Sequence, residues 1–486
     1  MKKIISKFWN HYKKANVAVK ASLWFALCSI LQKGISIITM PIFTRLMDTS
    51  EYGEYTIFQT WYNILIIIVT LNVQSEIFNK GLIENQDEKN AFTANQAGLL
   101  IVLSAIFSTV YFIFHPFINR FMGLSTFLMF VMIGEILGNA LIALWSARKR
   151  FEFDYKKIVT VTLLTSVLNP IVGIVAVSMA ENKVQARIIS NALVPICVSM
   201  ILLVGIKRGG SLCRNIQWWK TAVVTSLPLL PHYLSLVLLN QSDKLMINQF
   251  VGTEEAAIYS VAHSAGLLMT IVNTSINGSF VPWAYGKMKN EHGIGIKKIS
   301  SLLFGLVMGV NICLIWFAPE AVQILAAPQY GEAKWCLVPI AASVYFFFVY
   351  TLFVDIEIYF GANKYIAIAS VIAAILNLIL NYIFIPIYGY IAAGYTTLFS
   401  YFATMVMHYC FLRKTLKKNQ YGEKLFDEKM IAFWGILMVV TATIAMVLYG
   451  NMVIRFFIAI IIAIIIFWKK NYIMEIMQEI KKRSER

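Results

Sequence analysis

The residues of this sequence that could do chemistry are charged side chains inside long apolar segments. Lys33 and Glu135 lie nearest the middle of their segments. An ionised side chain costs roughly 2.5 to 3.5 kcal/mol near the centre of a bilayer, so it usually faces protein or water and has a partner. Lys33 could pair with Glu135, or its ammonium group could bind a phosphate as a point charge. Both alternatives stay open at this level.

Further ionisable residues lie nearer the ends of apolar segments. Asp243 and Lys244 are adjacent, about 100° apart on a helix, so we expect each to find its own partner or to reach the membrane interface. Arg45 has the same two interpretations. Four carboxylates are interpreted as intramembrane charge partners or as coupling groups for H+ or Na+: Glu76, Glu135, Asp355 and Glu357. For Glu76, Asp355 and Glu357, which lie toward inner helix ends, hydration alone is the alternative.

The sequence offers little for catalysis. It has no glycine-rich phosphate loop of the Walker type, so ATP hydrolysis is not expected. Its six cysteines are scattered without a CxxC pair, and no metal-ligand spacing or nucleophile motif stands out. We therefore expect neither an enzyme nor a protein with a metal or cofactor.

Composition indicates which elements must position these charges. Hydrophobic residues make up 59% of the chain and charged residues 14%, and the mean hydropathy is +0.69. A soluble globule carries nearer a quarter of its residues as charged types. Apolar runs of about 20 residues favour helices over the alternating pattern of a barrel. The expected fold class is an all-α, polytopic membrane protein.

Apolar runs between charged or turn-rich breaks predict fourteen transmembrane helices. They lie near residues 21–47, 54–78, 91–114, 124–147, 158–179, 186–206, 221–247, 256–280, 299–317, 334–358, 365–385, 391–412, 430–450 and 452–468.

The placement of basic residues fixes the expected orientation. Most of the 42 Lys and Arg fall in segments that are cytoplasmic when both termini are inside. This bias explains the net charge of +17 without a nucleic-acid partner. Outer connections are short, and the apolar spacing in the tail predicts an amphipathic helix on the inner membrane surface.

A weak internal repeat suggests two related halves. Thr49, Glu51 and Tyr55 match Thr253, Glu255 and Tyr259 without a gap, and Asn169 matches Asn377 at nearly the same offset. Two pseudo-symmetric six-helix lobes with two added helices would follow, and chance similarity is the alternative. The predicted parts are a basic juxtamembrane segment (1–20), an N-lobe (21–206), an inter-lobe loop (207–220), a C-lobe (221–412), a cytoplasmic loop (413–429), two final helices (430–468) and the tail (469–486).

Polar residues form stripes on the first, second, seventh and eighth predicted helices. Ser29, Gln32, Lys33 and Ser36 fall within an arc of about 100°. Such stripes are typical of helices that line a hydrated cavity, although they also serve ordinary helix packing. The cavity interpretation selects as substrate-binding candidates Gln32, Lys33, Arg45, Asn63, Gln74, His232, Ser242, Asp243, Lys244, His263 and Asn277. Pro228 and Pro231 predict a kink beside His232, as a hinge or a packing bend.

Four stretches carry a resemblance to a known family. They are RLMDTSEYGEYTIFQT from Arg45, SDKLMINQFVGTEEAAIYS from Ser242, SFVPWAYGKM from Ser279 and NLILNYIFIPIYGYIAAGYTT from Asn377. Together they resemble the multidrug/oligosaccharidyl-lipid/polysaccharide exporter (MOP) superfamily, and specifically its polysaccharide flippase branch of Wzx-like and capsule transporters. The resemblance covers nearly the whole chain. Fourteen spans also occur in the related MurJ-like lipid II flippases.

The resemblance implies a flippase of the cytoplasmic (inner) membrane. It would carry a polyprenyl-pyrophosphate-linked oligosaccharide, such as an O-antigen or capsule repeat unit, between two lobes by alternating access. The polyprenyl tail would stay in lipid against the last two helices. Expected partners are the lipid-linked oligosaccharide, the bilayer, and a glycan polymerase and glycosyltransferases of the same pathway. The alternatives are a cation-coupled multidrug antiporter and a membrane glycan polymerase or ligase, against which the short outer turns count.

Overall fold

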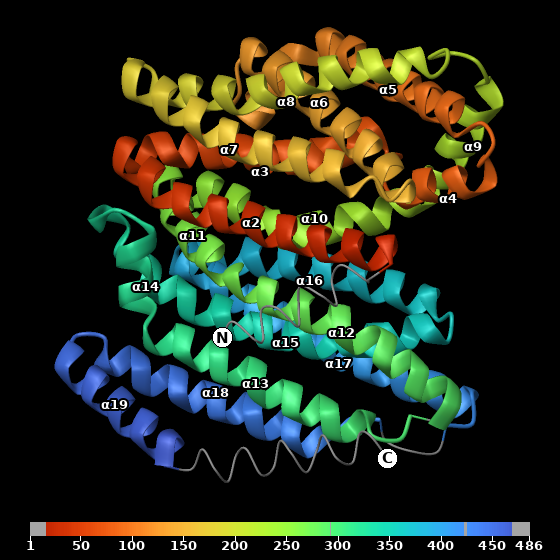
Figure 1. Ribbon diagram of the computed structural model, residues 1–486. Helices are drawn as coiled ribbons and strands as arrows, with labels where there is room; N and C mark the ends of the chain where they lie inside the picture. Colours follow the sequence, from red (N-terminus) through yellow and green to blue (C-terminus); the bar gives the residue numbers. More distant parts are fainter. Residues whose placement is uncertain (1–15, 292, 422–424, 469–486) are drawn as a thin grey trace, which may run out of the picture. The chain divides into compact units, whose positions relative to one another are not determined.

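The computed structural model describes residues 16–291, 293–421 and 425–468, and within them every regular element is a helix (Figure 1). The predicted juxtamembrane segment, up to residue 15, and the predicted tail helix lie outside the described residues. The all-α fold class expected from composition is confirmed. The chain divides into two compact units, Met1–Ser260 with Leu325–Ala327, and Val261–Ile324 with Pro328–Arg486. The finer lobe boundaries stay a prediction.

Within the described residues, the first unit is built from seven long helices, two short ones, a 3-10 turn and the start of one further helix. Its elements are α2 (Val17–Leu46), α3 (Thr49–Thr70), α4 (Glu76–Glu84), α5 (Lys89–Met122), α6 (Thr126–Phe151), α7 (Tyr155–Met179), α8 (Lys183–Arg208), α9 (Ile216–Ser226), the 3-10 turn η1 (Leu227–Leu229), α10 (Leu230–Phe250) and the start of α11 (Thr253–Gly266). Helix α6 packs against α8, α7 packs against both α8 and α2, and α3 packs against α10.

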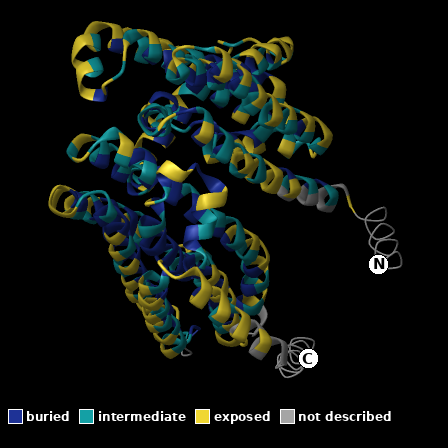
Figure 2. Ribbon diagram, turned by 90° about the vertical axis from the view of Figure 1, so that its left-hand side faces the viewer, coloured by how far each residue is buried: buried dark blue, intermediate teal, exposed yellow. Residues whose placement is uncertain are grey.

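The second unit surrounds one central helix. Its elements are the end of α11, α12 (Leu268–Glu291), α13 (Ile296–Trp316), α14 (Ala318–Leu325), the 3-10 turn η2 (Pro328–Tyr330), α15 (Ala333–Tyr359), α16 (Asn363–Tyr388), α17 (Ile391–Lys418), α18 (Glu428–Leu448) and α19 (Met452–Trp468). Helix α15 is buried over most of its length and contacts α12, α13, α16, α17 and α18. In each unit, exposed residues lie on the outward faces of the helices (Figure 2).

Eleven helical segments among the described residues are long and apolar enough to cross a membrane. The remaining predicted spans correspond to α3, α17 and α19. Helix α19 is short at 17 residues. Helices α3 and α17 carry many polar side chains, and much of that polarity is buried inside the protein, as Thr60 and Ser400 illustrate. The chain is a multi-pass membrane protein in which these helices rely on protein neighbours more than on lipid.

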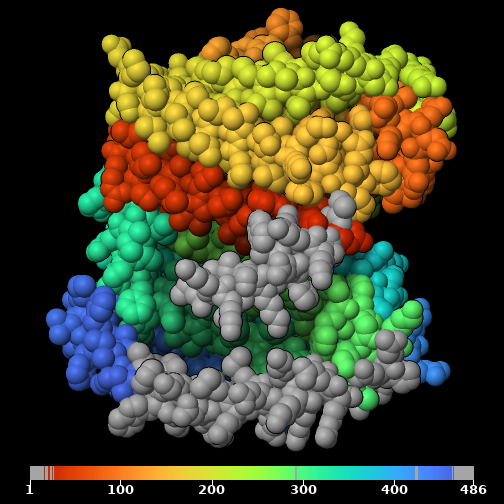
Figure 3. Space-filling model, in the orientation of Figure 1, coloured from red at the N-terminus to blue at the C-terminus, as the bar shows by residue number. Residues whose placement is uncertain are grey.

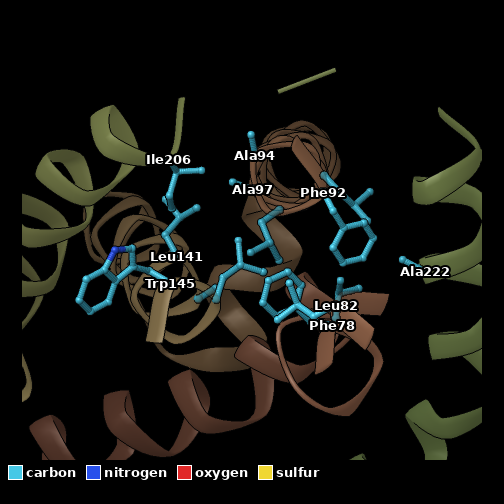
Figure 4. Packing of buried hydrophobic residues seen from close by; sticks show 14 of the residues in the cluster. Phe78, Leu82, Phe92, Ala94, Ala97, Leu141, Trp145, Ile206 and Ala222 are labelled. Atoms are coloured by element: carbon cyan, nitrogen blue, oxygen red, sulfur yellow. The ribbon is translucent and has the colours of Figure 1, made fainter. Parts of the chain in front are cut away.

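The exposed face of α7 in the first unit is apolar, as contact with lipid requires. On α7 the exposed side chains include Leu164, Val167, Ile171 and Val175, and this helix forms a broad part of the surface of its unit (Figure 3). Inside the first unit, the rings of Phe78 on α4 and Phe92 on α5 stack with their centres 5.7 Å apart, within a core of buried apolar residues (Figure 4).

The starts of α3 and α11 support the internal repeat. Each helix begins at the matched threonine, Thr49 or Thr253. Asp48 and Glu51 form a reciprocal capping box at the start of α3. The later match behaves alike: Asn169 of α7 donates to the backbone of the next helix at Asn191, and Asn377 of α16 donates to Thr397 of the next helix. The matched residues therefore hold equivalent positions in successive helix pairs.

Two helices of the first unit are interrupted. The predicted span 54–78 is wrong as a continuous helix, because α3 ends at Thr70 and the chain then takes left-handed conformations at Leu71 (φ 50°) and Asn72 (φ 54°). Such conformations are costly for residues other than glycine. The second interruption is η1, where Pro228 separates α9 from α10, and this confirms the predicted kink.

Candidate functional site

The polar stripe of α2 lies on its exposed side. Ser29, Gln32, Lys33 and Ser36 are all exposed in the first unit, and the hydroxyls of Ser29 and Ser36 bond only to backbone carbonyls of their own helix. Lys33 forms no ion pair with any described residue. Its ammonium group is therefore available to a ligand phosphate, the second of the two alternatives that the sequence left open.

Glu135 does not pair with Lys33, so the first alternative is wrong. Its carboxylate is 2% exposed and accepts a hydrogen bond of 2.6 Å from the side-chain amide of Asn191. The physical reason is helix rotation: Glu135 faces α8 inside the unit, whereas Lys33 faces outward on α2. An amide satisfies one carboxylate oxygen without a counter-charge.

Arg187 of α8 is a buried cation in this core, and it was not selected from the sequence. Its guanidinium lies 3.9 Å from the centre of the Phe43 ring and 4.8 Å from that of Tyr55, and it is only 7% exposed. It interacts electrostatically with Glu135. Atoms Oε2 of Glu135 and Nε and Nη1 of Arg187 have no hydrogen-bond partner among the described residues. Gly173 of α7 also lies against Arg187. Helices α2, α3, α6, α7 and α8 thus surround a buried ionic core in which some polar atoms have no hydrogen-bond partner among the described residues.

Three predicted site residues meet where the helices of the first unit are interrupted. The hydroxyl of Tyr233 on α10 donates a hydrogen bond to Glu76 at the start of α4, and Glu76 also acts electrostatically on His232. Gln74 lies in the linker between α3 and α4, and its Oε1 atom is buried without a hydrogen-bond partner, as is Nδ1 of His232. Discontinuous membrane helices often surround polar ligands, because their ends expose unpaired backbone groups.

Asp243 and Lys244 have separate partners, as expected for adjacent helix positions. The carboxylate of Asp243 is 1% exposed and accepts a hydrogen bond from Tyr259 of α11, while Lys244 bonds Gln241 at 3.1 Å. Snorkelling to the interface is wrong for Asp243, since it lies inside the unit beside buried Ser242. Arg45 is exposed and donates to the carbonyl oxygen of Pro41 at 2.8 Å.

The remaining predicted residues are buried or half-buried within their own units. Asn63 is half-buried on α3. In the second unit His263 is buried on α11 and Asn277 is half-buried on α12. Thr274 of the predicted stripe is exposed on α12, and its hydroxyl bonds the backbone of its own helix.

The sequence allowed the carboxylates of α15 to be satisfied by water at the inner end of the helix, but protein surrounds them instead. Glu357 is fully buried. Its Oε2 atom lies 2.9 Å from Nδ1 of His408 on α17, and the two atoms share a hydrogen bond. Asp355 is half-buried, and its backbone carbonyl accepts from Tyr285 of α12. His408 was not selected from the sequence. The only sign of it in the sequence is a single histidine within an apolar run, and such a run does not reveal which neighbouring helix the side chain faces.

An apolar cavity of about 770 Å³ lies in the second unit between α15, α17 and α18. Its lining includes Phe346, Phe402, Ile431 and Val439, and Gly435 widens it. At one end the hydroxyl of Tyr409 donates to Glu428. The volume is that of an ordinary small-molecule site, and the lining suits a hydrocarbon. Among the described side chains, none from α19 contributes to the lining.

Comparisons with known proteins agree on the family and the fold. Residues 18–285, more than half of the chain, match the family described as "Polysaccharide biosynthesis protein". The "Lsg locus putative protein 1" of Haemophilus influenzae is 21% identical over 74% of this chain and 88% of its own length. An uncharacterised membrane protein of Methanocaldococcus jannaschii is 20% identical over 91% of this chain and 92% of its own.

Solved structures show the same architecture at low sequence identity. The lipid II flippase MurJ, in an inward closed conformation, is similar with a TM-score of 0.66 at 12% identity, over 94% of this chain and all of that one. An inward-facing multidrug resistance MATE family transporter of the MOP superfamily gives 0.62 at 12% identity, over 83% of this chain and all of that one. The chain thus has the fold of MOP superfamily transporters and belongs to the polysaccharide biosynthesis protein family.

Proposed function

We propose that this protein is a flippase that moves a polyprenyl-pyrophosphate-linked oligosaccharide, an O-antigen, capsule or related repeat unit, from the inner to the outer leaflet of the cytoplasmic membrane. The observation that carries the proposal is the exposed polar stripe of α2, with Lys33 unpaired among the described residues. A cation held at membrane depth without a carboxylate partner suits an anionic head group. The neighbouring hydroxyls and amide suit sugars, and alternating access would carry the head group across.

The tail of such a substrate has a candidate place in the second unit. The apolar cavity between α17 and α18 can hold part of a hydrocarbon chain. This differs from the expectation that the last two helices would form the groove, because α19 is clamped elsewhere: Arg455 bonds Glu320 of α14 at 2.7 and 2.8 Å. The tail would then enter from lipid while the head group remains in water.

Proteoliposomes that contain defined lipid-linked sugars provide the test. We expect the wild-type protein to flip the sugar lipid and Lys33→Ala to reduce the rate at least tenfold, whereas Lys33→Arg keeps part of it. Ile38→Ala is the matched control, since Ile38 is 67% exposed on the same helix but away from the stripe. Equal rates for Lys33→Ala and wild type would remove Lys33 from the mechanism.

The rival function is a cation-coupled multidrug antiporter, supported by the fold shared with a MATE family transporter. A deletion strain discriminates between the two. Loss of surface glycan with unchanged drug susceptibility supports the flippase, and the reverse result supports the antiporter. The energy source is proposed to be H+ or Na+, since both units bury carboxylates that could bind either ion. Glycosyltransferases and a polymerase of the same pathway would supply and consume the substrate.

A further inference from the structure

The second unit contains a buried acid and base in direct contact. Nδ1 of His408 on α17 lies 2.9 Å from Oε2 of Glu357 on α15, and the two side chains are 2% and 0% exposed. The ring of Tyr350 stacks on His408 at 5.4 Å and 13°, and Tyr401 stacks behind it at 6.1 Å. Aromatic rings therefore cover the imidazole, while Oε1 of Glu357 has no hydrogen-bond partner among the described residues.

Few other ionisable groups approach this pair. On its own helices they are Tyr350, Tyr401 and Asp355. From α12 Tyr285 reaches the backbone of Asp355, and from α18 Glu428 is bonded by Tyr409 of α17. The buried residues of α13 and α16 include no charged side chain. Glu357 and His408 are therefore each other's only close charge partners in the described part of the unit.

Charge balance limits how many protons this pair can hold. With one proton the pair is neutral overall, whether the imidazole or the carboxyl carries it. Adding a second proton leaves a net positive charge, and removing the only one leaves a net negative charge. Either charge is expensive where water is excluded. In the packed conformation the pair therefore keeps one proton, and exchange requires water to reach it.

We propose that His408 and Glu357 form a proton-binding site that exchanges its proton only when α15 and α17 separate enough to admit water. The site would link proton movement to the packing of these two helices and would thereby couple transport to H+. This inference rests on the proposed function, because it assigns the ion that drives it. The uptake step is the transfer of a proton from water to the imidazole or the carboxylate, and the release step is its reverse.

The decisive variant is the double substitution Glu357→Gln with His408→Gln, because two amides keep a buried hydrogen bond but exchange no proton. In proteoliposomes with a trapped pH dye, we expect wild type to move protons together with lipid-linked sugar. The double variant should still equilibrate the sugar lipid down its gradient, with proton flux reduced at least tenfold and no pH dependence. Glu332→Gln is the matched control, since it removes an exposed carboxylate of the same unit that lies outside the apolar cavity, and it should keep coupled flux. Proton flux that persists in the double variant overturns the site.

A second measurement does not depend on the substrate. Hydrogen–deuterium exchange of the full chain between pH 5 and 9, corrected for intrinsic exchange, should show extra opening of α15 and α17 in wild type toward both pH limits and none in the double variant. Identical profiles overturn the site even if flipping is seen. If wild type flips no sugar lipid but these profiles differ, the proposed function fails and the proton site stands. If the double variant does not fold, Glu357→Gln alone serves, because neutral His408 can still donate to the amide.

Discussion

The side-chain amide of Asn191 donates a 2.6 Å hydrogen bond to the carboxylate of Glu135 and so joins α8 to α6. A third helix takes part, because Asn169 of α7 donates to the backbone carbonyl of Asn191 at 3.0 Å. The buried charge of the first unit is thus held by amides and by the more distant Arg187. This arrangement joins three helices of the bundle without any contribution from Lys33.

Removing Asn191 should destabilise the first unit. Asn191→Ala leaves a buried carboxylate without its donor, which costs about 1–3 kcal/mol, and we expect a lower melting temperature in detergent. Ser199→Ala is the control on the same helix, since that hydroxyl bonds only the backbone carbonyl of Ile196. An Asn191→Ala protein that melts with the control would contradict the role given to this bond.

Gly53 permits close contact between the starts of α3 and α11. A Cβ atom at Gly53 would lie 2.3 Å from the carbonyl oxygen of Thr253, closer than packed atoms allow. We expect Gly53→Ala to cost about 1–3 kcal/mol through overpacking. Gly34→Ala is the control, because nothing lies within 4 Å of that position. The comparison uses melting curves of the two variants, and equal stability would show that the helix starts do not touch.

A bulky residue in the apolar cavity should block the lipid tail without unfolding the unit. Ala432 lines the cavity, so Ala432→Trp should lower the flipping rate at least tenfold at unchanged melting temperature. Phe433→Trp serves for comparison, since Phe433 is 54% exposed on the same helix outside the lining. Full activity of Ala432→Trp would show that the lipid tail does not bind in this cavity.

The ion pair of Glu320 and Arg455 should make stability depend on pH. Burial raises the pKa of Glu320, but hydrogen bonds and the charge from Arg455 outweigh it and lower the pKa below its ordinary value of 4.5. A lowered folded-state pKa stabilises the protein above about pH 4.5, and this contribution is lost as the pH falls through the folded value.

Melting curves between pH 7 and pH 3.5 check this expectation. The difference between wild type and Glu320→Gln should be largest at pH 7 and should shrink below pH 4.5. Glu332→Gln removes a more exposed partner, 3.9 Å from Lys334, and should change little at any pH. A constant difference between wild type and Glu320→Gln would mean that the glutamate does not titrate through this pair.

The sequence was a good guide to the helices and a poor guide to their partners. Apolar length and the basic flanks place the helices, because lipid imposes that pattern on each segment separately. Proline announces the interruption at Pro228. The interruption at Leu71 was missed, although Asn72 and Ser75, just beyond it, are residue types that favour turns. In the fold this break lies next to the hydrogen bond that Tyr233 of α10 donates to Glu76.

Side-chain partners depend on how each helix is rotated against its neighbours. Lys33 and Glu135 carry opposite charges at similar depth, and pairing them was reasonable until α2 proved to turn Lys33 outward. Arg187 and His408 were overlooked for the same reason: α8 and α17 carry polar residues on several sides, so no stripe reveals which side is buried. The candidate proton site is a product of tertiary packing.

The polarity of α3 has a consequence for biosynthesis. Its main packing partner is α10, which follows it by some 160 residues in the chain. Helix α17 by contrast packs on α15 and α16, which are already synthesised when it emerges. Until α10 has been synthesised, α3 can pack only against other helices of its unit, such as α5, α6 and α8. The packing of α3 is therefore completed only after the long stretch of chain between it and α10 has been made.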